Sequence, residues 1–357
     1  MRILKYILLL ILLFLIGLTV FIITQKGDYS ITRSKIIKTP RATVYNFVND
    51  YRNWETFASW SEENGKTQFI FPAKTVGKGA NCSWDGTSEG FIKTINIKEN
   101  TSIEQKMVFN ETETEGKWTF KDTLGKTKVT WQTKGTMSVS MKIKAFLNGG
   151  IDNIIGDVYE KSLFKLDRTL DYELNTFNIK VDGIVAKPKQ FYLCQTITSY
   201  NDKVAKNIKI MMPKMIAFFE KNKMVMHGKP FVIYNSFDET KRTTNFSVCI
   251  PVKDSIRIMA GSDIESGKIE GFSAVKATLT GDYSHLKQAN QKVLDYLFEN
   301  SLKRNFAVNP YQVYNFSFID DKHPSKWKTE LYYPVYPKVI VNQAIPKPKP
   351  VAVAQNQ

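Results

Sequence analysis

The sequence predicts an α+β protein with an N-terminal transmembrane helix and two further regions, each built from strands and helices. Three observations carry this prediction. An apolar run without charges opens the chain, a series of alternating segments closed by a long helical pattern follows, and the C-terminal half contains a pattern that recurs about 80 residues later. Alternation with a period of two is typical of strands, whereas an apolar stripe repeating every three to four residues is typical of helices.

Residues 1–27 are predicted to be an uncleaved membrane anchor. No charge occurs between Ile7 and Ile23, and neighbouring apolar residues extend the span to about 20 residues, enough to cross the hydrocarbon core of a bilayer. A cleaved signal peptide would have a shorter apolar stretch followed by small residues, which this sequence lacks. We therefore expect a single-pass membrane protein. Basic residues stand on both sides of the span, so the positive-inside rule leaves open on which side the soluble regions lie.

Residues 28–176 are predicted to form an antiparallel sheet that grips one long helix. The segment from Tyr29 to Ile37 has the pattern of a strand, and Pro40 opens a helical segment. Further alternating stretches are separated by breaks rich in Asn, Gly and Asp, as antiparallel hairpins require. A long helix closes the region, with an apolar stripe made of Ile151, Ile154, Ile155, Val158, Leu163, Leu166 and Leu170.

The segment from Ile36 to Asp50, followed by Trp54, Phe57 and Trp60, resembles the opening motif of the START-like superfamily, also called SRPBCC or polyketide-cyclase-type. The resemblance covers essentially all of residues 28–175. It implies a helix-grip fold whose cavity, between the long helix and the sheet, holds hydrophobic ligands. We expect Trp54 and Trp60 to be core and rim aromatics. The cavity would be lost if large side chains fill it, and the candidates are Trp84, Phe91, Trp118 and Trp131.

Residues 177–337 contain one pattern twice. The offset is too long for a solenoid repeat and fits a duplicated half-domain. Two matching halves that pack about a pseudo-twofold axis leave a cleft between them, and such clefts commonly bind small ligands. The matching segments are Phe191 with Phe272, Phe218–Glu220 with Tyr296–Glu299, Phe231–Tyr234 with Tyr311–Tyr314, and Ile250–Val252 with Tyr333–Val335.

The carboxylate Glu330 is absent from the first half. When the prolines of the two halves are aligned, Ser247 occupies the matching place. A carboxylate that faces an aromatic cleft is desolvated, so it either takes up a proton or attracts a cation. An alternative is an ion pair with Lys328 or Lys253 on the surface of the strand. Glu330 is therefore the first candidate ligand-binding residue, and rings that could hold a flat or quaternary cation are supplied by Tyr234, Tyr283, Tyr314, Trp327 and Tyr332.

Four motifs lie in the duplicated region: Phe246–Val252, Leu279–Tyr283, Pro310–Tyr314 and Trp327–Val335. Together they resemble the GyrI-like small-molecule-binding domain, the effector-binding domain of AraC- and MerR-type regulators. The resemblance implies ligand binding. The usual DNA-binding helices are missing, and Thr280 stands where family members place a histidine, which weighs against transcriptional activation.

We therefore expect a membrane-anchored, non-catalytic binder or sensor of small hydrophobic ligands, with a cationic aromatic molecule as the candidate. One alternative, implied by the same resemblance, is a hydrolase of reactive electrophiles in which Glu330 activates water and Tyr283 or Tyr314 donates a hydrogen bond. A second alternative is a transcription-related regulator. No metal site, cofactor or catalytic residue is predicted, because the histidines stand alone and the cysteines are widely spaced at Cys82, Cys194 and Cys249.

The formal net charge of +16 does not predict a nucleic-acid partner. Between residues 177 and 337 the basic residues are scattered among acids, and only three of them are arginines. A solvated lysine-rich surface, attracted to an anionic membrane face, accounts for the charge. The sequence predicts no particular protein partner. Residues 338–357 alternate lysine with proline over part of their length, and we expect them to be a disordered tail.

Overall fold

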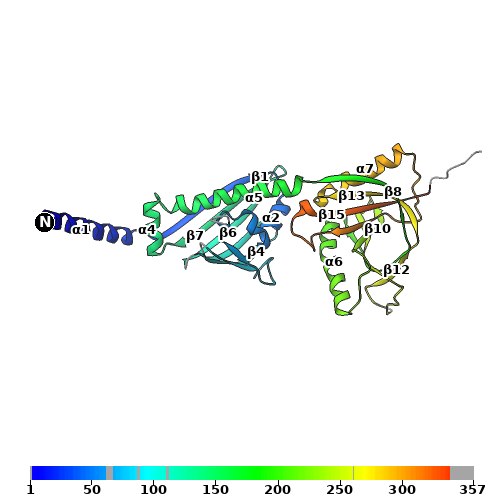
Figure 1. Ribbon diagram of the computed structural model, residues 1–357, viewed down its shortest axis with the longest axis horizontal. Helices are drawn as coiled ribbons and strands as arrows, with labels where there is room; N and C mark the ends of the chain where they lie inside the picture. Colours follow the sequence, from blue (N-terminus) through cyan, green and yellow to red (C-terminus); the bar gives the residue numbers. More distant parts are fainter. Residues whose placement is uncertain (1, 62–66, 87–88, 110–111, 260, 338–357) are drawn as a thin grey trace, which may run out of the picture. The chain divides into compact units, whose positions relative to one another are not determined.

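The computed structural model describes residues 2–61, 67–86, 89–109, 112–259 and 261–337. The chain divides into two compact units: the first runs to Thr176 and includes Lys322–Ser325, and the second starts at Phe177. Each unit contains one antiparallel sheet with helices packed on it, so the predicted α+β class is confirmed (Figure 1). The predicted disordered tail, residues 338–357, lies outside the described residues.

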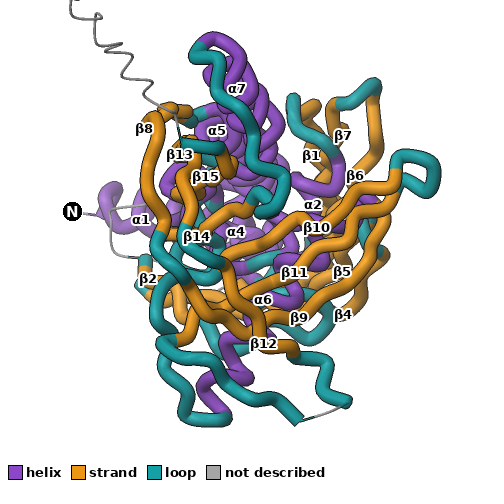
Figure 2. Tube along the Cα trace, turned by 90° about the vertical axis from the view of Figure 1, so that its right-hand side faces the viewer, coloured by secondary structure: helices purple, strands orange, loops and turns teal. Residues whose placement is uncertain are grey.

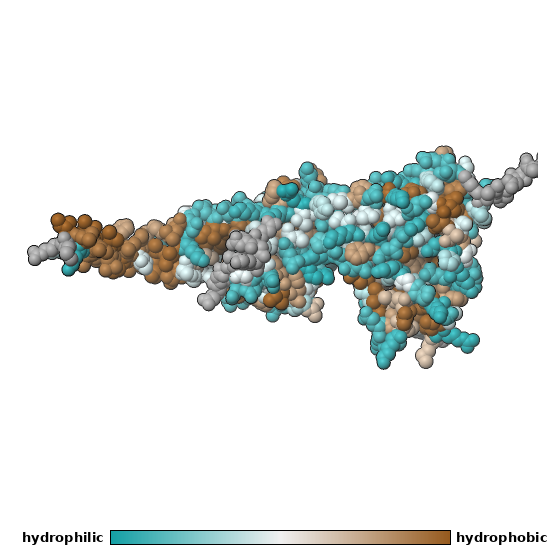
Figure 3. Space-filling model, viewed as in Figure 1, coloured by the Kyte–Doolittle hydropathy of each residue, from teal (hydrophilic) through white to brown (hydrophobic). Residues whose placement is uncertain are grey.

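The N-terminal helix α1 (Arg2–Thr24) contains the predicted apolar span. Its side chains are exposed along nearly the whole helix, which Figure 3 shows as a continuous hydrophobic surface. At about 1.5 Å per residue the helix is roughly 35 Å long, so its length and composition allow it to cross a membrane. Its C-terminal end is capped by Lys142, whose ammonium donates to the carbonyls of Ile23 at 2.8 Å and Gln25 at 2.6 Å.

The sheet of the first unit has seven strands in the order β1-β7-β6-β5-β4-β3-β2, and all neighbours are antiparallel. The β6–β7 hairpin turns at Leu124 and Gly125, which both have positive φ, as tight hairpins require. The strands are β1 (Asp28–Ile37), β2 (Gln68–Ile70), β3 (Asn81–Asp85), β4 (Gly90–Lys98), β5 (Ser102–Phe109), β6 (Thr112–Thr123) and β7 (Lys126–Thr136).

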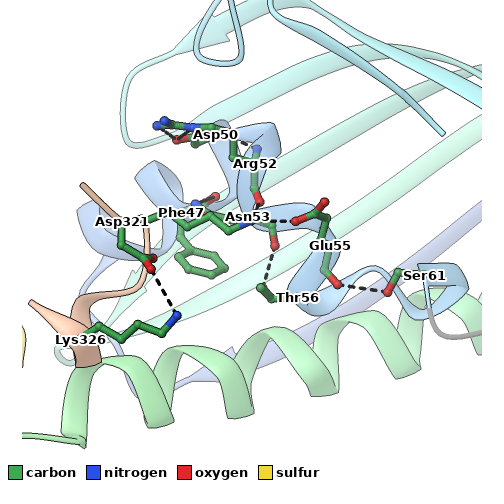
Figure 4. A network of polar contacts seen from close by, with 10 residues as sticks. Phe47, Asp50, Arg52, Asn53, Glu55, Thr56, Ser61, Asp321 and Lys326 are labelled. Carbon is green, nitrogen blue, oxygen red and sulfur yellow. Dashed lines mark hydrogen bonds and ion pairs between the residues drawn. The ribbon is translucent and has the colours of Figure 1, made fainter. Parts of the chain in front are cut away.

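The helices of this unit are α2 (Arg41–Asn49), α3 (Trp54–Phe57), α4 (Val139–Leu147) and α5 (Asp157–Asn175), and a π-helical turn (Asp152–Gly156) precedes α5. Figure 4 shows how polar contacts hold the irregular stretch from α2 to α3. The Asn53 amide donates to the carbonyl of Phe47 at 2.9 Å, and the Thr56 hydroxyl donates to the carbonyl of Asn53 at 2.6 Å. These bonds let the chain make short helical turns without leaving backbone carbonyls unpaired.

Large aromatic side chains fill the core of the first unit. Trp118 stacks on Trp131 with ring centroids 4.2 Å apart, and Tyr159 of α5 stacks on Trp131 at 3.8 Å. Trp54 is fully buried and donates its indole N–H to the carbonyl of Val48. Of the four residues expected to plug the interior, Trp84, Trp118 and Trp131 are buried, whereas Phe91 is 39% exposed. The START-like identity of this unit remains a prediction.

The second unit has an eight-stranded antiparallel sheet in the order β12-β9-β11-β10-β14-β15-β13-β8. This order is symmetric about the central pair β10–β14, because β9, β11 and β10 mirror β13, β15 and β14. The strands are β8 (Asn178–Lys187), β9 (Gln190–Tyr200), β10 (Phe231–Asp238), β11 (Thr243–Val252), β12 (Glu265–Ile269), β13 (Phe272–Thr280), β14 (Tyr311–Phe316) and β15 (Lys328–Val335).

The two halves of this unit follow the repeat seen in the sequence. The element order β9, α6 (Val204–Lys221), β10, β11 recurs as β13, α7 (Leu286–Glu299), β14, β15. Each matched segment predicted from the sequence falls on equivalent elements, for example Phe231–Tyr234 on β10 and Tyr311–Tyr314 on β14. The duplicated α+β architecture of this unit is thereby confirmed.

Both helices pack on the same face of this sheet. Helix α6 buries Val232, and α7 lies over Leu331. Val232 and Leu331 both pair with Gln312, and paired residues point to the same side of a sheet. The opposite face, here called the helix-free face, is seen in front in Figure 2. Its apolar cluster contains only strand residues: Cys194, Phe231, Ile233, Cys249, Ala274, Tyr311 and Tyr332, with Val185, Tyr192, Ile269, Phe272 and Val313 around them.

Candidate functional site

The six candidate ligand-binding residues lie on opposite faces of the sheet. Glu330 and Tyr332, two residues apart on β15, point to the helix-free face. Tyr314 belongs to the core under α6, and Tyr234 packs against that core. Tyr283 and Trp327 stack on each other at 4.6 Å, and Tyr283 contacts Tyr314 at 5.4 Å. The structure therefore does not bring the six residues into one cleft.

The Glu330 carboxylate is bonded through both of its oxygens. Lys276 on β13 places its Nζ 2.6 Å from Oε1, and the Tyr332 hydroxyl donates to Oε2 at 2.7 Å. The side chains of Glu330 and Lys276 are only 17% and 24% exposed, so the ion pair lies partly below the surface. The pairing partner is neither Lys328 nor Lys253, the two expected for a surface ion pair.

These contacts keep Glu330 ionised. Burial raises the pKa of its carboxyl group, but the interactions with Lys276 and Tyr332 outweigh burial and hold the pKa below its usual value. Burial, together with the bond to this carboxylate, raises the pKa of the Tyr332 hydroxyl. Glu330 is thus an anion and Tyr332 a neutral hydrogen-bond donor near neutral pH.

A second lysine, Lys187 at the end of β8, lies on the same face. Its Nζ stands 4.3 Å from the centroid of the Tyr332 ring, a cation–π contact. Burial lowers the pKa of Lys187; Glu330 partly opposes this shift, and Lys276 adds to it. No carboxylate forms an ion pair with Lys187 in the part of the chain that the structure describes.

Aromatic rings surround this charged group. Tyr311 stacks on Tyr332 with centroids 5.1 Å apart, and Phe231 and Phe272 approach Tyr311 at 5.4 and 6.1 Å. Tyr192 meets Phe231 edge to face at 5.4 Å. The Tyr192 ring lies over Gly267, where even a Cβ atom would come within 2.3 Å of it, so glycine is needed at that position.

The stacked rings of Tyr283 and Trp327 lie on the helix side, and Trp327 already holds a lysine. Burial raises the pKa of Tyr283 and Tyr314 well above the ordinary tyrosine value. The Trp327 indole donates to the carbonyl of Asp321 at 2.7 Å, and its ring carries the ammonium of Lys209 at 5.5 Å. Asp321 also pairs with Lys326 at 3.2 Å (Figure 4). The ring face of Trp327 is therefore occupied by the protein's own cation.

A groove of about 590 Å³ lies on the helix side, between the first turns of α6 and α7. It takes residues from both halves of the duplicated unit, including Tyr234, Gln312 and Tyr333. The Tyr234 hydroxyl donates to the Gln312 amide oxygen at 3.1 Å, and the Tyr333 hydroxyl donates to Asn290 at 2.7 Å. The polar side chains on the floor of the groove are thus already hydrogen-bonded in two pairs, Tyr234 with Gln312 and Tyr333 with Asn290.

The first unit contains a small apolar cavity of about 90 Å³ between the sheet, α4 and the turn that precedes α5. Ile154, Ile155, Val158 and Tyr159 line its helical side. Trp60 also lines it, and the indole N–H of Trp60 has no hydrogen-bond partner among the described residues. Sites for drug-sized ligands occupy about 300 to 1,000 Å³, so the tryptophan-filled interior leaves room for only a few small groups.

Sequence reasoning missed Lys276, Lys187 and Tyr311. Lys276 and Lys187 come from β13 and β8, far from Glu330 in sequence, and only the strand register brings them together. Tyr311 belongs to the matched segment Tyr311–Tyr314, in which the sequence predicted only Tyr314 as a site residue. Among the described residues there is no group of three or more His, Cys, Asp or Glu side chains placed to hold a metal ion. The cysteines Cys82, Cys194 and Cys249 are buried and unbridged.

The chain resembles known proteins in its second unit. A model of the GyrI-like small molecule binding domain matches residues 184–336. Among solved structures, the cryo-EM EcmrR–DNA complex is 14% identical, covering 55% of this chain and 69% of that chain at a TM-score of 0.39. The crystal structure of the EcmrR C-terminal domain is 16% identical over 45% and 98%, with a TM-score of 0.37. Protein Ms6760 from Mycobacterium smegmatis is 14% identical over 39% and 88%, with a TM-score of 0.31.

No curated protein matches the sequence. Likeness to solved structures at these identities and scores carries no conclusion about function. The family match covers the whole eight-stranded sheet except the start of β8. Residues 184–336 therefore form a GyrI-like small molecule binding domain.

Proposed function

We propose that the GyrI-like domain binds a small aromatic molecule on its helix-free face, beside Glu330. The observation that carries the proposal is a partly buried, ionised carboxylate within a group of aromatic rings, on the face that no helix of this unit covers. The Tyr311 and Tyr332 rings, 2% and 5% exposed, stack on each other beneath this face, and the Lys276–Glu330 pair supplies charges that orient a polar substituent.

The N-terminal helix supports membrane anchoring as part of the same proposal. A helix of this length, exposed on nearly every side and free of charge along its centre, is stable in hydrocarbon and costly in water. An anchored binding domain would meet amphipathic molecules that concentrate in lipid. Extraction of the full-length protein with carbonate tests the anchor, because an integral protein stays in the membrane pellet and a peripheral one is released.

The contacts at Glu330 favour binding over hydrolysis. A general base must accept a proton, whereas Lys276 and Tyr332 hold this carboxylate as a paired anion. Tyr283 and Tyr314, the expected hydrogen-bond donors for a hydrolase, belong to the helix side of the sheet. The hydroxyl that donates to Glu330 is instead that of Tyr332.

Ligand binding can be tested with the full-length protein in a non-ionic detergent, by calorimetric titration with naphthalene derivatives. We expect binding that weakens by about 0.5 to 1.5 kcal/mol in Tyr332→Leu, because one ring of the stack is lost. Tyr336→Leu is the matched control, since Tyr336 is 53% exposed and lies outside the ring group. If both variants bind like the wild type, the ligand site is elsewhere.

A further inference from the structure

We propose that the ligand of the helix-free face is a small aromatic anion, and that Lys187 is the group that receives its negative charge. This inference rests on the proposed function, because it names the chemical class of ligand for the same face. It departs from the cationic ligand expected from the sequence. Four features of the structure support it.

The first feature is that Glu330 has little capacity left for a ligand. One oxygen accepts from Lys276 at 2.6 Å, and the other accepts from Tyr332 at 2.7 Å. A cationic ligand would have to displace the Lys276 ammonium, which would then be left partly buried without its counter-charge. An anionic ligand leaves this ion pair intact.

The second feature is that the ring faces suited to a ligand cation already carry the protein's own ammonium groups. Lys187 lies 4.3 Å from the centroid of Tyr332, and Lys209 lies 5.5 Å from that of Trp327. A second cation against the same rings would meet repulsion at short range. Of these two lysines, Lys187 lies on the helix-free face, where it favours a negatively charged group, and Lys209 lies on the helix side.

The third feature is that Lys187 has hydrogen-bonding capacity to spare. An ammonium group has three N–H donors, and in the described part of the chain no carboxylate pairs with this one. A partly buried cation without a counter-ion is costly, and a ligand carboxylate or sulfonate would remove that cost. The buried Tyr332 ring beneath Lys187 fixes the position of the ammonium group on this face.

The fourth feature is the balance of charge at this end of the sheet. Lys276 pairs with Glu330, and Lys180 pairs with Asp182 at 3.1 Å, which leaves Lys187 as the surplus charge. Glu265, an exposed carboxylate, also points to the helix-free face, but it stands on β12, the edge strand opposite to β8. The face is therefore positive beside Tyr332 and negative at its far edge.

The test uses three bicyclic probes of similar size: 2-naphthoate, the neutral 2-naphthamide and the cation N-methylquinolinium. Each is titrated into the full-length protein in non-ionic detergent, with empty micelles as the blank. We expect 2-naphthoate to bind most tightly and N-methylquinolinium most weakly. Lys187→Met keeps the length of the side chain and should weaken 2-naphthoate binding roughly 10- to 100-fold, while 2-naphthamide binding changes less than about threefold.

Two further variants serve as controls. Lys268→Met removes a lysine from the opposite face of the same sheet and should leave all three affinities unchanged. Glu330→Gln keeps the shape of the side chain and releases Lys276, so 2-naphthoate should bind equally well or more tightly. A cation site predicts the reverse, a loss of N-methylquinolinium binding in Glu330→Gln.

The outcomes separate the inference from the proposed function. If N-methylquinolinium binds most tightly and loses affinity in Glu330→Gln, the face binds small aromatic molecules and the anion assignment is overturned. If 2-naphthoate binds but Lys187→Met leaves its affinity unchanged, Lys187 is not the receiving group and the inference fails. If none of the three probes binds, the proposed function fails and the inference fails with it.

Discussion

The two halves of the GyrI-like domain place different chemistry at equivalent positions of one scaffold. Ser247 pairs across the sheet with Thr196 and Ile233, just as Glu330 pairs with Thr278 and Val313. Two residues further along, the first half has Cys249 opposite Cys194, whereas the second has Tyr332 opposite Lys276. A neutral group in one half thus corresponds to a charged group in the other.

The bonding around the two positions differs accordingly. The Ser247 hydroxyl shares a hydrogen bond with Thr196 at 2.9 Å and accepts one from the Asn235 amide at 2.8 Å. These are neutral bonds between short side chains, while Glu330 is held by an ammonium and a phenol. The two halves therefore share the sheet architecture, but the second half carries charge beside a group of rings where the first half has neutral side chains. The proposed ligand site therefore draws its charged groups from the second half and from β8.

The largest expected effect is a loss of stability at core positions that the two halves share. Phe231 and Tyr311 occupy equivalent places and are 1% and 2% exposed, so Phe231→Ala and Tyr311→Ala should each cost about 3 to 5 kcal/mol of stability. Hydrogen exchange of peptides from the second unit measures the opening free energy of that unit alone. Tyr336→Ala, at an exposed tyrosine, should stay within about 0.5 kcal/mol. If only one of Phe231→Ala and Tyr311→Ala lowered the stability, the two positions would not be equivalent in the core.

The next largest effect is expected from removing the Lys276–Glu330 ion pair of the second half. Lys276→Met should destabilise the second unit by about 1 kcal/mol, between the values for exposed and for fully buried ion pairs. A double-mutant cycle with Glu330→Gln should give a coupling energy of similar size, because the two groups are in contact. Thr196→Val removes the neighbour of Ser247 and is the matched change in the first half. Zero coupling between Lys276 and Glu330 would contradict the ion pair.

The pH dependence should also differ between the halves. Because the pKa of Glu330 is lower in the folded state than in the unfolded chain, its contribution to stability is present above the unfolded value, near 4.3, and is lost as the pH falls through the folded value. The stability difference between wild type and Glu330→Gln should therefore shrink as the pH drops below about 4. Ser247→Ala should show a difference from wild type that does not vary with pH. Denaturation series between pH 3 and 7 would reveal a constant difference at Glu330 if this assignment is wrong.

The smallest effect is expected at Ser247 itself. Ser247→Ala removes one hydroxyl, but the Asn235 amide keeps its bond to Asn245 at 2.8 Å, so the cost should be no more than about 1 kcal/mol. Affinity for 2-naphthoate should stay unchanged, since the charged group lies in the other half. A loss of affinity comparable to that of Lys187→Met would show that both halves contact the ligand.

Much of the architecture could be predicted from local pattern and repetition. The uncharged run from Ile7 to Ile23 specifies the apolar helix, because helix length and hydrophobicity are local properties. The matched segments of residues 177–337 identified the duplicated fold, since equal spacing of strand and helix patterns requires equal element order. The same repeat distinguishes Glu330 from Ser247 at the matching position. A cavity between the long helix and the sheet of the first unit was also predicted, but its small volume was not, because tertiary packing decides how far the tryptophans fill the interior.

The partners of Glu330 were decided by tertiary structure alone. The period of two along β15 places Glu330 with Tyr332, but it says nothing about which residues stand on β13, β14 and β8. Lys276 and Lys187 reach the carboxylate and the ring only through strand register, which depends on loop lengths and bulges such as the one between Lys276 and Ala277. Tyr314 and Trp327 are aromatic residues close to the same strands, yet they lie on the helix side. Sequence alone determined which residue types are available and how often the pattern repeats, whereas the pairing of distant strands decided which charges meet, because electrostatic contacts depend on distances of a few ångströms.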